Sequence, residues 1–132
     1  MRIVLDTNVL ISALIRDGKP RELLDMLFRK HHTLILSRPI IEEFSRAAAD
    51  QRIKHYADSE EVVRFLRTLV AGGLLVTLTS RFKVLNTPDD LILRTAYDGK
   101  AHIIVTGDKH LLELASFKGI KILTVSEAMQ YL

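Results

Sequence analysis

Short apolar segments alternate with helical segments along the whole of this 132-residue chain. The apolar segments are rich in Ile, Leu and Val and predict strands at residues 3–5, 33–36, 74–78, 103–105 and 120–123. Helices are predicted near residues 8–15, 20–30, 39–49, 59–72, 87–98 and 108–116, with a closing helical turn from 126. The alternation predicts a single α/β domain over residues 1–132, with a central, mainly parallel β-sheet flanked by helices on both faces.

The composition of the chain excludes several classes of protein. The chain has no cysteine, which excludes disulfide scaffolds, zinc–thiolate and iron–sulfur sites, and cysteine catalysis. Its longest apolar stretch, residues 69–76, contains two glycines and is far shorter than the roughly 20 residues that a membrane helix needs. Hydrophobic residues make up 48% and charged residues 27%, an ordinary globular balance. We therefore expect a soluble cytoplasmic domain with no membrane contact.

Two acids follow predicted strands directly, at the edge where α/β sheets bind their ligands. Asp6 comes after the first strand, and Asp108 comes two residues after Val105-Thr106 in the fourth segment. Asp108 is also a good helix N-cap and Asp6 a good turn residue, so a purely structural role stays open for both. Because parallel strands end at the same edge, we expect these two carboxylates to lie close together.

A third acid lies on the apolar face of a predicted helix. Ile40, Phe44 and Ala47 share one face by their spacing, and Glu43 falls within that stripe, whereas Glu42 is turned toward solvent. A carboxylate on a packed face is costly unless a cation or hydrogen bonds compensate it. The alternative is a Glu at the edge of the stripe whose stem packs while its head reaches water.

The same test separates two adjacent acids at the start of a later helix. Asp89 lies on the face of Ile92, Leu93 and Ala96, at its amino-terminal end, and is the better candidate for an inward position. Asp90 has Arg94 four residues further on, so we expect it to favour the helix dipole or to pair with that arginine.

Four acids from four separate segments are thus expected to converge: Asp6, Glu43, Asp89 and Asp108. Carboxylates ~4 Å apart repel by roughly 4 kcal/mol per pair at an effective dielectric constant near 20, so such a cluster needs shared protons or a cation. Oxygen ligands alone favour Mg²⁺ or Mn²⁺. With a net charge of +3 and a pI near 9.3, an acidic centre would have basic surroundings, which suits metal-assisted hydrolysis of a phosphate polymer.

Three segments, in this order, resemble those that carry the acids of PIN-domain ribonucleases, and most closely the VapC-like toxins of toxin–antitoxin systems. They are DTNVLI at residues 6–11, SRPIIEE at residues 37–43, and residues 89–112 with the run VTGDK at 105–109. The resemblance spans nearly the whole chain. It implies a PIN-domain fold in which Asp6, Glu43, Asp89 and Asp108 hold Mg²⁺ or Mn²⁺, with Asp90 in a supporting role and Asn8 and Thr106 orienting the ligands.

The resemblance also implies an activity and partners. A metal-dependent endoribonuclease, an RNA substrate, a homodimer and a cognate antitoxin protein are expected. Two positions depart from the family's pattern, because Asn86 stands where relatives often have a further acid and His110 where they often have an aspartate. Both departures favour one tightly held ion, and His110 is either a substrate contact or an exposed residue of the first helical turn.

Other readings of the same sequence remain. A PIN-like fold that binds RNA or protein without cutting is the main alternative. A phosphorelay receiver would need an acid pair after the first strand, and a phosphatase using Asp6 would commonly have a second acid where Asn8 stands. Eight basic residues either line an RNA path or form a solvated face: Arg38, Arg46, Arg52, Lys54, Arg64, Arg67, Arg81 and Lys83.

Overall fold

Strand β1 (Arg2–Leu5) lies inside a six-stranded sheet of order β3-β2-β1-β4-β6-β5. This arrangement is seen in a computed structural model, which describes residues 1–132. The other strands are β2 (Thr33–Ser37), β3 (Leu74–Val76), β4 (Ile103–Val105), β5 (Ser116–Phe117) and β6 (Ile120–Leu123). All neighbouring strands are parallel except β5 and β6. The predicted α/β fold with a mainly parallel sheet is confirmed.

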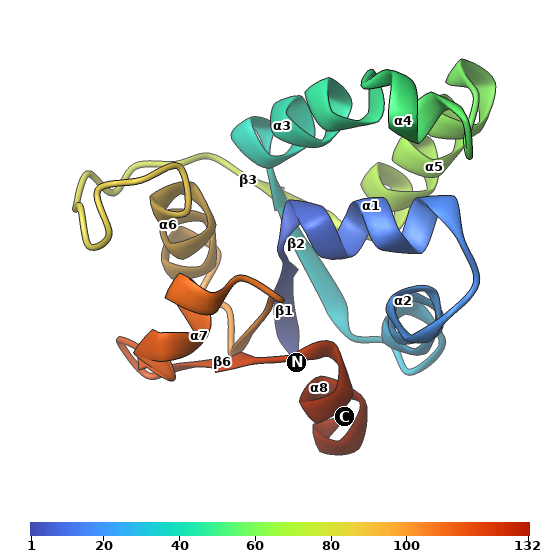
Figure 1. The fold of residues 1–132 in the computed structure, drawn as a ribbon. Helices are drawn as coiled ribbons and strands as arrows, with labels where there is room; N and C mark the ends of the chain where they lie inside the picture. The colour runs from blue at the N-terminus through green and yellow to red at the C-terminus, as the bar shows by residue number, and fades with distance from the viewer.

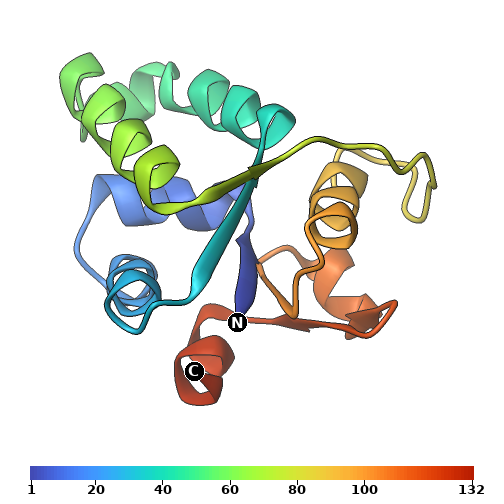
Figure 2. The same ribbon diagram turned by 180° about the vertical axis from the view of Figure 1, so that it is seen from behind.

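Eight helices connect the strands. They are α1 (Thr7–Ile15), α2 (Lys19–Arg29), α3 (Arg38–Ala48), α4 (Gln51–Lys54), α5 (Ser59–Gly72), α6 (Asp90–Asp98), α7 (Lys109–Leu114) and α8 (Val125–Tyr131). Helices α6 and α7 lie on one side of the strands, and α1, α2 and α8 lie on the other (Figures 1 and 2). Helices α3 to α5 form an arm whose first helix packs against α1 (Figure 1). None of the helices is long and apolar enough to cross a membrane.

The register of the sheet brings the ends of β1 and β4 to the same level. Leu5 pairs with Val105, and the Asp6 amide continues the ladder by donating to the Val105 carbonyl at 2.9 Å. Both strands are buried on both faces, which explains why their sequences are continuously apolar rather than alternating. The residues that follow β1 and β4 therefore emerge side by side at the carboxyl edge of the sheet.

Most predicted elements are present, and the differences concern their ends. The N-cap of α5 is Asp58, just before the predicted start at residue 59, and its carboxylate forms a capping box with Glu61. Helix α8 begins at Val125, capped by Thr124, rather than at Ser126. Helix α3 begins at Arg38, and the Ser37 side chain before it does not cap the helix, because its hydroxyl bonds the Thr95 hydroxyl of α6 at 2.7 Å.

The short strand β5 was not predicted. It forms an antiparallel hairpin with β6 through Lys118 and Gly119, whose φ angles of 49° and 83° are both positive, as in the tight turns that suit two-residue hairpins. A strand of two residues is too short to carry an alternating pattern. The hairpin lies at the sheet's far edge and leaves the carboxyl edge of β4 unobstructed.

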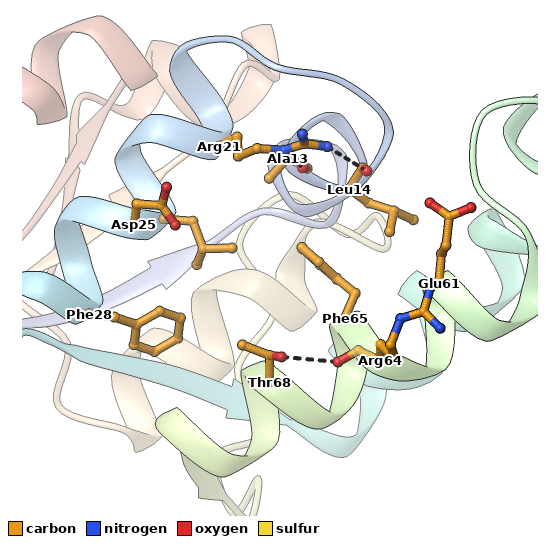
Figure 3. A pocket seen from close by; sticks show the side chains of 10 residues that line it. Ala13, Leu14, Arg21, Asp25, Phe28, Glu61, Arg64, Phe65 and Thr68 are labelled. Carbon is orange, nitrogen blue, oxygen red and sulfur yellow. Dashed lines mark hydrogen bonds between the residues drawn. The ribbon is translucent and has the colours of Figure 1, made fainter.

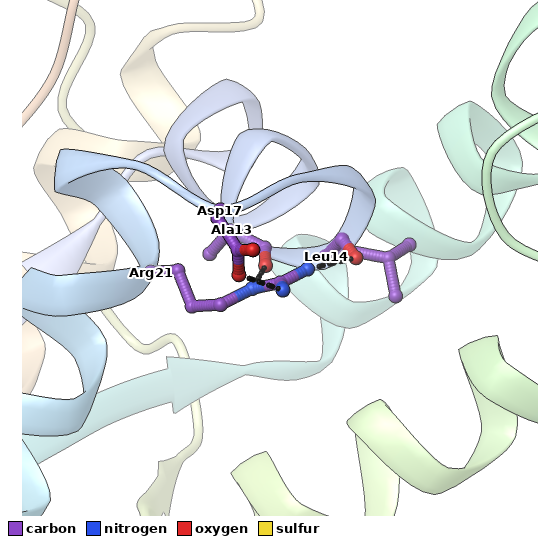
Figure 4. Close-up of polar contacts among 4 residues, drawn as sticks. All are labelled: Ala13, Leu14, Asp17 and Arg21. Carbon is purple, nitrogen blue, oxygen red and sulfur yellow. Dashed lines mark hydrogen bonds and ion pairs between the residues drawn. The ribbon is translucent and has the colours of Figure 1, made fainter.

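Arg21 of α2 fastens the end of α1. Its Nε donates to the Ala13 carbonyl and its Nη2 to the Leu14 carbonyl, both at 2.8 Å, and its Nη1 bonds the Asp17 carboxylate at 2.7 Å (Figure 4). The last carbonyls of a helix have no partner within the helix, so this guanidinium satisfies them and favours the negative end of the helix dipole.

A groove of about 360 Å³ lies between α1, α2 and α5. Figure 3 shows Phe28 and Phe65 facing it, with Asp25, Glu61 and Arg64 at its rim. The lining comes from the carboxyl end of α1, whereas the acids expected to converge follow β1 and β4 or lie on α3 and before α6. This groove is therefore separate from the carboxyl edge.

Candidate acidic site at the carboxyl edge of the sheet

Asp6 forms the base of the site. It follows β1 directly, precedes α1, and is only 5% exposed. Burial raises the pKa of Asp6, and the nearby charge of Asp108 raises it further, while a hydrogen bond from Thr106 and the amides of Thr7 and Asn8 oppose the shift. A buried carboxylate with a raised pKa is a group for which a cation would be favourable.

Thr106 connects two of the acids. Its buried hydroxyl donates to Asp6 Oδ2 at 2.7 Å and accepts from the Asp108 amide at 2.9 Å. The resemblance implied that Thr106 orients the ligands, and these two contacts are what such an orienting role requires.

Asp108 divides its two carboxylate oxygens. Oδ1 accepts from the amides of His110 and Leu111, which makes Asp108 the N-cap of α7 as predicted. Oδ2 accepts no hydrogen bond from a backbone amide or a hydroxyl, and the charge of Asp108 raises the pKa values of both Asp6 and Asp89. Capping therefore fixes the side chain while one oxygen remains available.

Glu43 reaches the same place from α3. Ile40 and Phe44 are buried beside it, Glu43 itself is half-buried, and Glu42 is exposed in an ion pair with Arg38, as the helical pattern predicted. Burial raises the pKa of Glu43, followed by the charge of Asp6, while Arg46 and Thr7 lower it. Its head group thus lies within electrostatic range of Asp6.

Asp89 completes the set. It is half-buried just before α6, and burial raises its pKa first, followed by the charges of Asp108 and Asp6. A contact with the Asp108 carboxyl group, which favours a shared proton, and the charge of Glu43 add to the shift. Each of the four acids predicted from the sequence therefore lies within electrostatic range of at least two of the others, although they come from four separate segments.

Asp90 fulfils only one of its two predicted roles, because it is an acid in the first turn of α6 but forms no ion pair with Arg94. Instead it is 8% exposed and accepts from the backbone amides of Val84, Leu85 and Asn86 at 2.8–3.2 Å. The connection between β3 and α6 folds back over the start of the helix, so three amides reach the carboxylate first. Asp90 thereby holds the connection that carries Asp89, a supporting role of a different kind.

The remaining nominated residues lie around this cluster. Asn8 is exposed, makes no side-chain hydrogen bond and lines a shallow pocket beside Thr106, so its orienting role stays a prediction. His110 is exposed in the first turn of α7, and Asn86 is exposed with a φ of 55°. All eight basic residues considered above are exposed, and Arg38, Arg52 and Arg64 pair with neighbouring acids.

One polar residue of the site escaped the sequence reasoning. The Thr7 hydroxyl is buried without a well-formed hydrogen bond, yet it lies close enough to Glu43 to favour the charged form of that carboxylate. Its position after Asp6 at the carboxyl edge was the available signal. A buried, unsatisfied hydroxyl among carboxylates is a natural place for a water or a hydrated ion.

The donor set fits a hard divalent ion with its own waters. As placed here, no three of these carboxylates surround a single point at coordination distance. Mg²⁺ commonly keeps several waters and uses only one or two carboxylates directly, and the other acids then bind those waters. Four carboxylates, three with raised pKa, and no histidine or cysteine among them match that chemistry.

Comparison with known families settles the classification. The family model described as PIN domain matches residues 2–110, a span that contains all four acids. This chain belongs to the PIN domain family. The predicted fold and the family resemblance are both confirmed.

The chain is also similar to two further proteins. An uncharacterized protein of Methanocaldococcus jannaschii is 32% identical over 117 residues, which cover 86% of this chain and 75% of that protein. The crystal structure of VapBC2 from Rickettsia felis, bound to a DNA fragment from their promoter, matches with a TM-score of 0.65 over 94% of this chain and 98% of that one. At 14% identity this second match shows a shared fold.

Proposed function

We propose that this PIN domain is a metal-dependent endoribonuclease that hydrolyses RNA phosphodiester bonds with Mg²⁺ or Mn²⁺. The observation that carries the proposal is that carboxylates from four segments affect one another. Burial raises the pKa values of Asp6, Glu43 and Asp89, and in each case the charge of a neighbouring carboxylate raises the pKa further. No lysine or arginine forms an ion pair with any of them. Such a cluster favours a bound cation.

The positions of the four acids suit them to different roles in binding a metal ion. Asp6 and the free oxygen of Asp108 are fixed by Thr106 and by the capping of α7, so they are the most rigid oxygen donors. Glu43 lies on α3 and Asp89 just before α6, and both are more exposed than Asp6. This position suits binding of the ion through its water ligands. A bound divalent ion would supply a hydroxide at neutral pH and offset charge on the phosphate. The protein's part is to hold these oxygens in place before substrate arrives.

We further propose that the protein is the toxin of a toxin–antitoxin pair, that it acts in the cytoplasm, and that it forms a homodimer. The fold shared with a chain from the VapBC2 complex supports the toxin assignment. A protein antitoxin would then be the natural partner. The dimer rests on the family resemblance alone.

Cleavage of a labelled single-stranded RNA tests the enzymatic proposal. Purified protein is assayed with Mg²⁺, with Mn²⁺ and with EDTA, beside Asp6→Asn and Glu43→Gln, and Glu42→Gln serves as the matched control because Glu42 is exposed on the same helix. We expect metal-dependent cutting by the parent and the control, and none by the two site variants. Cutting by all four proteins would place the activity elsewhere, and a protein without cutting or metal response would be the silent binding module.

A further inference from the structure

A cleft of about 400 Å³ opens beside α6, next to the acidic site. Its walls are the connection that follows β3 and the exposed side of α6. Nine residues line it, of which only two are apolar: Arg81, Phe82, Lys83, Asn86, Thr87, Pro88, Asp90, Leu91 and Arg94. We call it the Arg81–Arg94 cleft. Figures 1 and 2 show this connection running out beside α6.

None of the basic residues of this cleft forms an ion pair, although the charge of Arg94 helps to lower the pKa of Asp98. Arg81 and Lys83 are exposed, and neither forms a hydrogen bond or an ion pair. Arg94 is half-buried, and its Nε donates to the Ser80 carbonyl at 2.9 Å, which fixes the plane of the guanidinium while both Nη groups stay free. A fixed guanidinium with free Nη groups is suited to bidentate binding of a phosphate.

The one acid in the lining does not cancel these charges. Asp90 accepts three backbone amides and is 8% exposed, so its carboxylate is turned into the connection. The charged groups that remain available to a ligand in the lining are those of Arg81, Lys83 and Arg94. The cleft adjoins a cluster of opposite sign, because Pro88 and Asp90 line the cleft and Asp89 between them faces the other acids.

Aromatic packing holds the basic residues in place. The Phe82 ring packs edge-on against Tyr97, with 5.5 Å between the ring centroids, and at an interplanar angle of 47° against Phe117, with 5.1 Å between the centroids. Because Phe82 lies between Arg81 and Lys83 in the chain, this packing anchors both neighbours at the rim. A positively charged cleft fixed beside a metal-binding edge is an arrangement for a polyanion that crosses from one to the other.

We propose that the Arg81–Arg94 cleft binds backbone phosphates of single-stranded RNA, adjoining the phosphate that is cleaved at the acidic site. The inference rests on the proposed function and adds where the substrate strand runs. A protein partner would need apolar anchors, and the cleft offers only Phe82 and Leu91, of which Phe82 is already packed against two aromatic rings. Contacts to phosphate position the strand without reading its sequence.

Binding without cleavage tests the cleft independently of the enzymatic proposal. A labelled single-stranded RNA is titrated in EDTA, which prevents cutting, at several salt concentrations. The double variant Arg81→Ala/Lys83→Ala is compared with the parent and with Arg29→Ala, an exposed arginine without partners at the end of α2 before β2 begins. The logarithm of the association constant falls with the logarithm of the salt concentration. We expect this dependence to become less steep by about 1.4 in the double variant, for two lost phosphate contacts, and to stay unchanged in Arg29→Ala.

Arg94→Gln provides a third variant, and its melting temperature is measured because the guanidinium also bonds the Ser80 carbonyl. We expect weaker RNA binding at an unchanged fold, to the same degree for two unrelated RNA sequences. Equal affinity and slope in the double variant and the parent would overturn the cleft, as would a parent that binds no RNA at low salt. Weakened binding together with no cleavage under any metal would uphold the cleft and reject the nuclease.

Discussion

Thr106 Oγ1 donates a 2.7 Å hydrogen bond to Asp6 Oδ2, across 100 positions of sequence. The same oxygen accepts from the Asp108 amide, so a single hydroxyl sets the relative positions of two acids on neighbouring strands. It is fully buried and therefore has no access to bulk water. The geometry of the acidic site thus depends on a residue that carries no charge.

Replacing the Thr106 hydroxyl is expected to lower the cleavage activity more than it changes the fold. Thr106→Val preserves the volume but leaves Asp6 Oδ2 without its donor, so we expect a 10- to 100-fold loss of cleavage, of order the effect of other ligand-orienting groups. The unfolding free energy should fall by about 1–3 kcal/mol for the unpaired buried groups. Thr106→Ser keeps the hydroxyl and should retain most activity; an equally inactive Ser variant would argue against the bridge.

The acidic cluster should cost stability at neutral pH. The pKa values of Asp6, Glu43 and Asp89 are raised above 3.8, 4.5 and 3.8, so above those values the folded protein binds more protons than the unfolded chain. Stability therefore falls as pH rises through that window. We expect Glu43→Gln to raise the melting temperature at pH 7 and to lose this advantage at mildly acidic pH. Glu42→Gln should show no such pH-dependent gain.

Divalent ions should restore the stability that the acidic cluster costs at neutral pH. In the metal-free protein, Mg²⁺ or Mn²⁺ would bind the folded state alone and raise the melting temperature by mass action. Protons compete for carboxyl groups whose pKa is raised, so the shift should be larger at pH 7.5 than at pH 5. Thermal melts with and without metal measure this, and the same shift in Asp6→Asn would show that the ion binds elsewhere.

Substitution of the adjacent acids Asp89 and Asp90 should have different effects on the stability of the protein. Asp89→Asn removes charge repulsion and a proposed metal-binding oxygen, so we expect lost cleavage at an equal or higher melting temperature. Asp90→Asn replaces an acceptor of three amides by a group that also donates, so we expect a loss of about 1–3 kcal/mol in unfolding free energy. Melting curves and cleavage rates of both variants decide. An inactive but fully stable Asp90→Asn protein would assign Asp90 to the acidic site itself.

Arg21 offers a test of the scaffold alone. Arg21→Met retains most of the stem but leaves the Ala13 and Leu14 carbonyls without their donor, so we expect about 1–3 kcal/mol lower unfolding free energy. Cleavage below the melting temperature should not change, because the acids come from other segments. Denaturant titration measures the loss, with Arg29→Met as the exposed comparison on the same helix.

Local pattern was sufficient wherever a strand or a helix face determined the position of a side chain. Asp6 and Asp108 followed from strands that end at one edge, and Glu43 from the face of Ile40 and Phe44. Glu42 turned to solvent for the same reason. These predictions needed only the periods of strands and helices, which neighbours in the chain determine.

Of the two roles predicted for Asp90, the ion pair with Arg94 was wrong because the partners of Asp90 are set by tertiary structure, whereas its place in the first turn of α6 agrees with the helix-dipole alternative. Its spacing to Arg94 fits a helical ion pair, but the connection after β3 returns and offers three amides to the carboxylate. Arg94 is drawn to the Ser80 carbonyl by the same fold of the chain. A 13-residue connection without regular structure has no periodicity from which such contacts can be read. The contact between Thr7 and Glu43 was missed for the same reason.

The pairing of β1 with β4 has a consequence for a chain still emerging from the ribosome. Asp6 is made before the strand that completes its surroundings, because β4, with Thr106 and Asp108 behind it, follows about a hundred residues later. Until then Asp6 stands without either partner. Under the proposed function the chain would be inactive while it is nascent, because no chain lacking β4 and the residues that follow it holds the full set of acids.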